Sequence, residues 1–228
     1  MVKGDDIMGI LESHLSKNCD PRMVGVLSLS IKEAYGFLDD LIQKEKILQR
    51  PEMKKTWGHI RHGLVDVGLK QVLQSSNIPH DIADKSSSRY RNGHTYLMIE
   101  TKGAIITPAK VTKPGSVPKK ALYRSKGSIL NKNYNLFEEP QNINADYNEE
   151  KIPFLLLTYG GKDHRLDFVN LGLPDVGVGA WIDSVDITNS PVLLLNKEEI
   201  SNDLQLTFTS KAEEIIKRGV EGGEEGAI

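Results

Sequence analysis

Four residues near the middle of the chain have the types and spacing that phosphodiester hydrolysis uses. Glu100 and Lys102 follow the apolar run 96–99, and Asp81 and Asp84 lie 19 and 16 residues before Glu100. In a strand, side chains at positions i and i+2 point to the same face, so Glu100 and Lys102 would share one. Carboxylates can hold Mg²⁺ while a lysine orients the attacking water. The pattern indicates a metal-dependent nuclease whose catalytic residues are Asp81 or Asp84, Glu100 and Lys102.

This arrangement is similar to the PD-(D/E)xK nuclease signature, in which an acidic residue precedes a strand-borne acid-x-lysine triplet. The resemblance covers about 25 residues and implies magnesium as the cofactor, with Asp81 and Glu100 as its ligands. The chain departs from the signature because His80 separates Pro79 from Asp81, and because a glycine directly after Lys102 favours a turn there. The alternative is that these are solvent-facing strand residues that bind no cofactor.

Residues 85–137 form a strongly basic stretch in an otherwise acidic chain. They hold eleven Lys and Arg residues and one acid, Glu100, which gives a net charge of +10, whereas residues 138–228 have a net charge of −11. Lysines and arginines neutralise phosphates, and exposed tyrosines among them can stack on unpaired bases. The stretch therefore predicts a nucleic-acid-binding surface, with DNA expected rather than RNA. The residues expected to bind are Arg89, Tyr90, Arg91, Lys110, Lys113, Lys119, Lys120, Tyr123, Arg124 and Lys126.

Two other interpretations of this charge remain open. The basic stretch could pair with the acidic C-terminal third, either within the fold or across a dimer. It could instead dock on an acidic protein, which would make the chain a protein-interaction module. Salt distinguishes these cases, because a polyanion site loses affinity as salt rises, whereas an internally neutralised stretch binds nothing.

The first 79 residues predict three helices with apolar residues at every third or fourth position. Residues 5–15 form a short helix, residues 21–47 a long one that begins after an Asp-Pro cap, and residues 51–75 a third. Ser30 and Glu33 could form a capping box that splits the long helix, but a single helix is expected. Helices with matching apolar stripes pack together, either within one chain or in a homodimer.

The chain changes to short strands after Pro79. Residues 95–101 and 104–107 predict a hairpin joined at Lys102 and Gly103. Prolines and glycines then predict a basic loop or arm over 108–134. Further strands are expected at 153–159, 166–172, 179–187, 191–195 and 203–208, followed by a helix from Ser210 to Arg218 and a disordered acidic tail over 219–228.

The predicted fold class is α+β, with a helical N-terminal part (1–79) packed on a C-terminal part (80–218) that is rich in mixed or antiparallel sheet. No apolar run approaches the ~20 residues that span a bilayer, and the N-terminus lacks the pattern of a secretion signal. We therefore expect a cytoplasmic nucleic-acid-binding regulatory or accessory protein, in character a mobile-element or defence-related factor. It needs no cofactor unless it is a nuclease.

Overall fold

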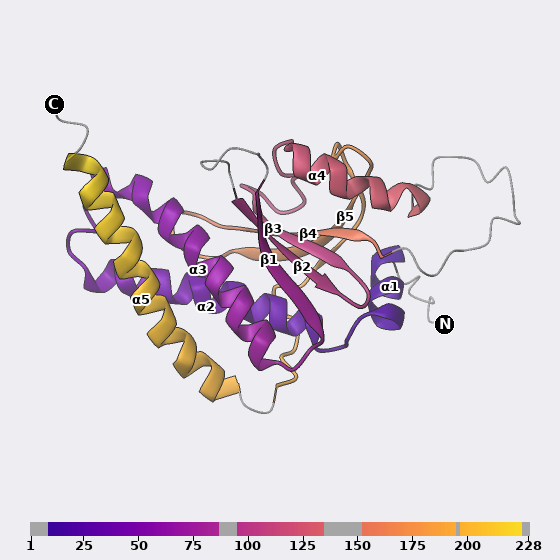
Figure 1. Cartoon of the computed structure of the whole chain (residues 1–228), viewed down its shortest axis with the longest axis horizontal. Coiled ribbons are helices and arrows are strands. Elements are labelled where there is room, and N and C mark those ends of the chain that lie inside the picture. Colours follow the sequence, from indigo (N-terminus) through magenta and orange to yellow (C-terminus); the bar gives the residue numbers. More distant parts are fainter. Residues whose placement is uncertain (1–8, 87–94, 135–151, 195–196, 225–228) are drawn as a thin grey trace, which may run out of the picture. The chain divides into compact units, whose positions relative to one another are not determined.

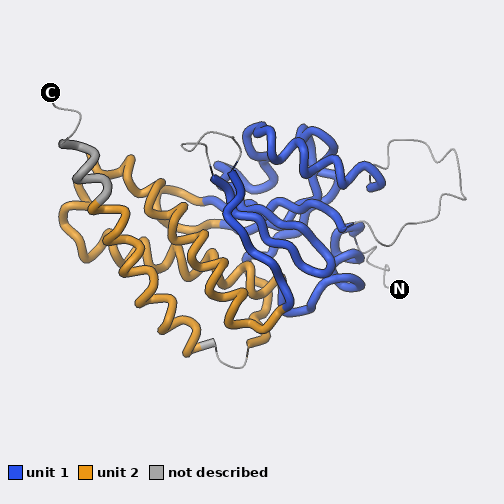
Figure 2. The backbone as a smooth tube through the Cα atoms, viewed as in Figure 1, with its two compact units in different colours: residues 1–23, 79–160, 168–188 blue, residues 24–78, 161–167, 189–228 orange. Residues whose placement is uncertain are grey.

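The structure is a computed structural model that describes residues 9–86, 95–134, 152–194 and 197–224 (Figure 1). For residues 197 and 218–224 it describes the backbone alone. The chain divides into two compact units (Figure 2). Unit 1 comprises residues 1–23, 79–160 and 168–188, and unit 2 comprises residues 24–78, 161–167 and 189–228.

Unit 1 contains a six-stranded mixed sheet whose strands follow one another in sequence order. β3 and β4 pair in parallel, and the other neighbours are antiparallel. Every residue of β4 and β5 is buried, as expected for central strands covered on both faces. The strands are β1 (His80–Ser86), β2 (Thr95–Thr101), β3 (Ile105–Lys110), β4 (Phe154–Gly160), β5 (Phe168–Pro174) and β6 (Trp181–Asp186).

The parallel pairing of β3 and β4 requires a crossover connection. This connection carries helix α4 (Leu122–Gly127) and the 3-10 helix η2 (Ser128–Tyr134). Phe154 and Leu156 of β4 form a buried apolar cluster with Val178. Partly buried side chains that pack on this cluster come from β3, the crossover and β6: Ile105, Val117 and Trp181.

Helix α1 (Ile10–Asn18) contacts the sheet of the same unit. The backbone N–H of Leu11 donates to Asp183 Oδ2 of β6 over 2.8 Å. At the β2–β3 hairpin, a Cβ on Gly103 would come within 2.6 Å of Cys19 Sγ. Glycine at this turn therefore permits the close approach of the chain that follows α1.

Burial raises the pKa of the Cys19 thiol from its ordinary value of 9.0 to about 11. Because the thiolate is the nucleophile, iodoacetamide should label Cys19 roughly 100-fold more slowly than an exposed cysteine at about pH 8. The rate should rise about tenfold per pH unit until the raised pKa is reached. Mass spectrometry of timed samples measures this rate. Labelling as fast as that of free cysteine would contradict the expectation.

The prediction of a loop or arm over 108–134 is wrong at both ends, because β3 continues through Pro108 and residues 122–134 form α4 and η2. Along β3, the N–H groups of Ile105 and Val111 both donate toward the β4 side. Successive backbone N–H groups of a strand point to opposite sides, so the nitrogen of Pro108, which carries no hydrogen, faces β2. The β2–β3 ladder ends at Ile106, so Pro108 removes no ladder hydrogen bond.

Unit 2 is largely helical. It contains most of α2 (Met23–Lys44), together with α3 (Lys54–Ser75) and α5 (Lys197–Glu224). α3 contacts α5, and Phe37 of α2 packs against Phe208 of α5 with ring centroids 5.4 Å apart. The apolar stripes of these helices thus meet within one chain.

The three predicted N-terminal helices are present. The short helix predicted over 5–15 is α1, and residues 1–8 lie outside the described residues. The long helix predicted over 21–47 is uninterrupted, because the Ser30 hydroxyl donates to the Val26 carbonyl of the same helix over 2.8 Å instead of capping a new one.

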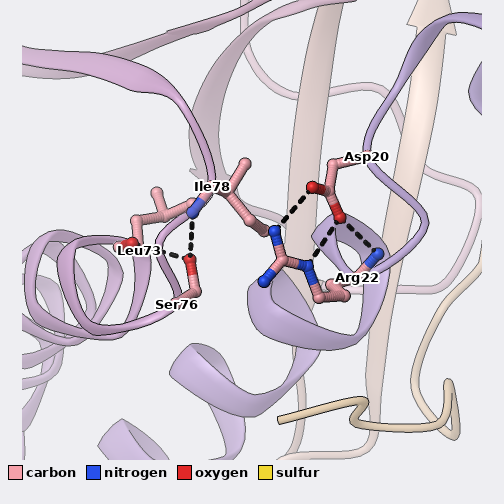
Figure 3. Close-up of polar contacts among 5 residues, drawn as sticks. All are labelled: Asp20, Arg22, Leu73, Ser76 and Ile78. Carbon is pink, nitrogen blue, oxygen red and sulfur yellow. Dashed lines mark hydrogen bonds and ion pairs between the residues drawn. The ribbon is translucent and has the colours of Figure 1, made fainter.

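Side chains mark the start of α2 and the end of α3 (Figure 3). Before α2, Asp20 Oδ1 accepts the backbone N–H of Arg22 at 2.9 Å, and the two side chains form an ion pair of 2.8 Å. The side-chain hydrogen bond from Arg22 lowers the pKa of Asp20. After α3, the Ser76 hydroxyl donates to the Leu73 carbonyl and accepts the N–H of Ile78. Both ends agree with the sequence prediction.

The strand predicted over 203–208 is wrong, because these residues belong to α5. Leu204, Phe208 and Ala212 recur every four positions and are all buried, a helical period that outweighs the β-propensity of the intervening threonines. The hydroxyl of Thr209 donates to the carbonyl one turn earlier, which satisfies it within the helix.

The remaining C-terminal elements also differ from their predictions. Residues 191–194 form no strand, and residue 195 lies outside the described residues. Ser210 lies inside α5 instead of capping it, and the helix continues past Arg218 to Glu224. The fold class itself, α+β, is confirmed. None of the described helices combines the length and apolarity that crossing a membrane requires.

Candidate nucleic-acid interface

The described part of the basic stretch that follows β3 forms a surface that we call the α4–η2 surface, residues 113–134. This segment contains no acidic residue. Five of its lysines are exposed, and none of them lies within ion-pair distance of a described carboxylate. Among the described residues, these lysines form no ion pairs with the acidic C-terminal third, which was one of the alternatives that the sequence left open. They are Lys113, Lys119, Lys120, Lys126 and Lys132.

Asn131 fixes this segment to the sheet. Its side chain is fully buried, and its Nδ2 donates to the carbonyls of Phe154 at 2.8 Å and Pro174 at 2.9 Å. Its Oδ1 accepts the N–H of Phe154 at 2.8 Å. Ser128 Oγ accepts the N–H of Gly177 at 2.9 Å. These bonds tie η2 to the start of β4 and the end of β5, so an ordered scaffold carries the lysines.

α4 approaches β4 closely because residue 127 is glycine. A Cβ at Gly127 would come within 2.7 Å of the Phe154 ring, which is closer than side-chain packing allows. Phe154 itself is buried in the apolar cluster and cannot retreat without disturbing it. The glycine therefore sets the height of α4 above the sheet.

An aromatic stack joins α4 to β2. The rings of Tyr123 and Tyr96 stack with centroids 3.8 Å and planes 13° apart. The guanidinium carbon of Arg124 lies 4.9 Å from the centroid of the Tyr123 ring, and Arg124 Nη1 donates to the Lys119 carbonyl at 2.7 Å. Aromatic rings and a guanidinium among lysines present stacking partners for bases beside charges for phosphates.

A groove of about 320 Å³ lies beside this stack. Its described lining comes mainly from β2 and α4, is mostly aromatic and apolar, and contains one charged side chain, Lys126. Large apolar side chains of α4 and η2 are also exposed: Leu122 (65%), Ile129 (58%) and Leu130 (41%). The α4–η2 surface thus combines exposed cations with exposed apolar area.

The other residues predicted to bind nucleic acid are placed differently. Lys110 is exposed at the end of β3. The densest basic point of the sequence, formed by Arg89, Tyr90 and Arg91, lies outside the described residues. The other six predicted residues, Lys113, Lys119, Lys120, Tyr123, Arg124 and Lys126, lie on the α4–η2 surface, which is one continuous segment of the chain.

The structure brings two of the four nuclease candidates together. In the β1–β2 ladder Asp81 lies directly opposite Glu100, so the two side chains share a face. Asp84 is three positions from Asp81 and projects from the other face. Lys102 follows the end of β2 and lies in the turn. Among the described residues, no group of three or more His, Cys, Asp or Glu side chains is arranged to hold a metal ion.

A second polar cluster, which the sequence did not predict, lies within unit 2. Arg61 of α3 is 5% exposed, its Nη1 donates to the Asp163 carbonyl at 2.9 Å, and its guanidinium carbon lies 5.5 Å from the Tyr35 ring centroid. Burial raises the pKa of Tyr35. His164 Nε2 lies 2.8 Å from Asp39 Oδ1. These contacts hold the β4–β5 loop against α2 and α3, a structural use of buried charge.

No protein-family model, curated protein or solved structure matches this chain.

Proposed function

We propose that the protein binds nucleic acid, DNA rather than RNA, through the α4–η2 surface and acts as a cytoplasmic regulatory or accessory protein. One observation carries the proposal. Five exposed lysines without a described carboxylate partner lie on a segment that Asn131 fastens to the sheet. Cations that the described fold does not neutralise attract phosphates and release their counterions.

A triple substitution of Lys119, Lys120 and Lys126 to glutamine tests this proposal. Fluorescence anisotropy with labelled DNA should show a loss of roughly 10- to 100-fold in affinity at low salt. The slope of log affinity against log salt should fall by about 2 to 3, because three phosphate contacts are removed.

The matched control replaces three exposed lysines of unit 2, Lys32, Lys44 and Lys46, with glutamine. It changes the net charge of the protein by the same amount. An equal loss of affinity in both triple variants would contradict binding at the α4–η2 surface. No binding by the wild-type protein at low salt would overturn the proposal and direct attention to an acidic protein partner.

A second candidate function, magnesium-dependent nucleic-acid cleavage, is favoured by the β1–β2 register that places Asp81 opposite Glu100. Two carboxylates on one face can hold Mg²⁺ together with substrate phosphates. If the candidate is right, Glu100→Gln should abolish magnesium-dependent DNA cleavage. Asp84→Asn should leave cleavage unchanged, because Asp84 projects from the other face. Cleavage that persists in Glu100→Gln, or no cleavage by the wild-type protein, would remove this candidate.

A further inference from the structure

The residues around the groove between β2 and α4 suit a ligand that has both a flat, apolar ring and an anionic group. Tyr96, Tyr123 and Phe154 contribute aromatic surface to it, and Met98 and Leu130 contribute aliphatic surface. At about 320 Å³ it lies within the usual size range of small-ligand sites, about 300–1,000 Å³. Phosphates alone would leave this apolar surface in water.

The charge around the groove selects an anionic occupant. Lys126 lines it, Lys119 and Lys120 precede α4, and no described lining residue carries a negative charge. Arg124 lies over the Tyr123 ring and adds a planar cation to the stack. A nucleotide joins the two requirements, because its base is a flat ring and its phosphate is an anion.

The exposed apolar residues favour an unpaired strand over a duplex. In a duplex the bases are stacked inside, and proteins read them by inserting a helix or a β-ribbon into a groove. α4 has six residues, and the most exposed apolar side chains on it and on η2 are the aliphatic Leu122 and Ile129. Aliphatic and aromatic side chains make favourable apolar and stacking contacts with splayed-out bases, whereas they make no favourable contact with phosphates.

We propose that the groove between β2 and α4 holds an unpaired nucleobase of a single-stranded nucleic acid whose phosphates lie on Lys119, Lys120 and Lys126. This inference rests on the proposed function and makes it narrower. The Tyr96–Tyr123 stack forms a preformed wall of the groove, and the anchoring of η2 by Asn131 keeps that wall in place before any ligand binds.

The test measures anisotropy of the full-length wild-type protein with four labelled probes at one low salt concentration. They are an oligothymidylate, an abasic strand of equal length, a duplex of equal length and a polyglutamate peptide. The oligothymidylate should bind more tightly than each of the others. Because the abasic strand keeps the phosphates and lacks the bases, its deficit measures the contribution of the bases directly.

Two variants of Tyr123 locate that contribution. Tyr123→Leu should weaken oligothymidylate binding by about 5- to 100-fold and leave abasic-strand binding unchanged, since base–aromatic stacking is worth roughly that factor per base. Tyr123→Phe keeps the ring and should bind as the wild type does. Thermal unfolding of both variants checks that the fold is retained.

The outcomes separate this inference from the proposed function. Equal affinity for the oligothymidylate and the abasic strand would overturn the inference and leave phosphate binding intact. Duplex binding as tight as single-strand binding would do the same. Preference for polyglutamate would assign the surface to an acidic protein, and no binding to any probe would overturn both proposals.

Discussion

Replacing Asn131 with alanine should lower the free energy of unfolding by roughly 3 kcal/mol or more. The substitution removes three hydrogen bonds at once and leaves the N–H and carbonyl of Phe154 and the carbonyl of Pro174 without this partner. Each buried polar group left unsatisfied costs about 1–3 kcal/mol. Urea unfolding should show a lower midpoint with an unchanged m-value.

Asn133 provides a matched control, because it is the same residue type two positions further along η2 and is exposed. Asn133→Ala should change the unfolding free energy by less than about 0.5 kcal/mol. The Asn131 variant should also bind DNA more weakly, since the α4–η2 surface loses its attachment to the sheet. Equal stability of the two variants would show that Asn131 does not anchor η2.

The second large effect is expected for Leu38→Asp, which should abolish cooperative folding. Leu38 is fully buried in unit 2, so the aspartate must either lose its hydration or disrupt the packing of α2. That cost is comparable with the whole stability of a typical domain, roughly 5–15 kcal/mol. Circular dichroism should show a loss of helix, and heating should give no sharp transition.

This expectation also tests the homodimer that the apolar stripes of the N-terminal helices left open. A side chain buried inside one chain is not available for pairing with a second copy. Ile47→Asp is the control, because Ile47 is 56% exposed and the same type of change there should leave the protein folded. A folded Leu38→Asp protein whose mass fell by half in solution would instead place Leu38 at a dimer interface.

Sequence reasoning succeeded where one periodicity was long and undisturbed. α2 and α3 carry apolar residues at helical spacing over five turns or more, and the β2–β3 hairpin has a short run of apolar or β-branched residues on each side of a turn glycine. These signals are local. Each of them predicts the same structure that the tertiary packing later selects.

It failed where local signals were mixed or the determinant was not local. Residues 203–208 alternate polar and apolar side chains, so a strand pattern concealed the period of four that α5 uses. Pro108 is acceptable in β3 only because β2 leaves the ladder, which no local pattern reveals.

The positive charge of the candidate site could be predicted from the sequence, but the hydrogen bonds that hold the site in place could not. Its lysines and Tyr123 were visible as composition, because cations cluster there without acids. Asn131 looked like any polar residue in a basic loop, since its partners are carbonyls of β4 and β5 that lie 23 and 43 residues away. Arg61 was hidden in the same way, because its partner comes from a loop 102 residues later.

Among the described strands, the sequential order leaves the sheet open, with β1 and β6 at its two edges. An open edge presents unpaired backbone groups to which a strand of another molecule can add. Both edges carry side chains that oppose such aggregation: Asp81, Asp84 and Lys85 on β1, and Asp183 and Asp186 on β6. Charge at these positions disfavours edge-to-edge pairing with a neighbouring molecule, a role that the acids of β1 would serve whether or not they also bind a metal.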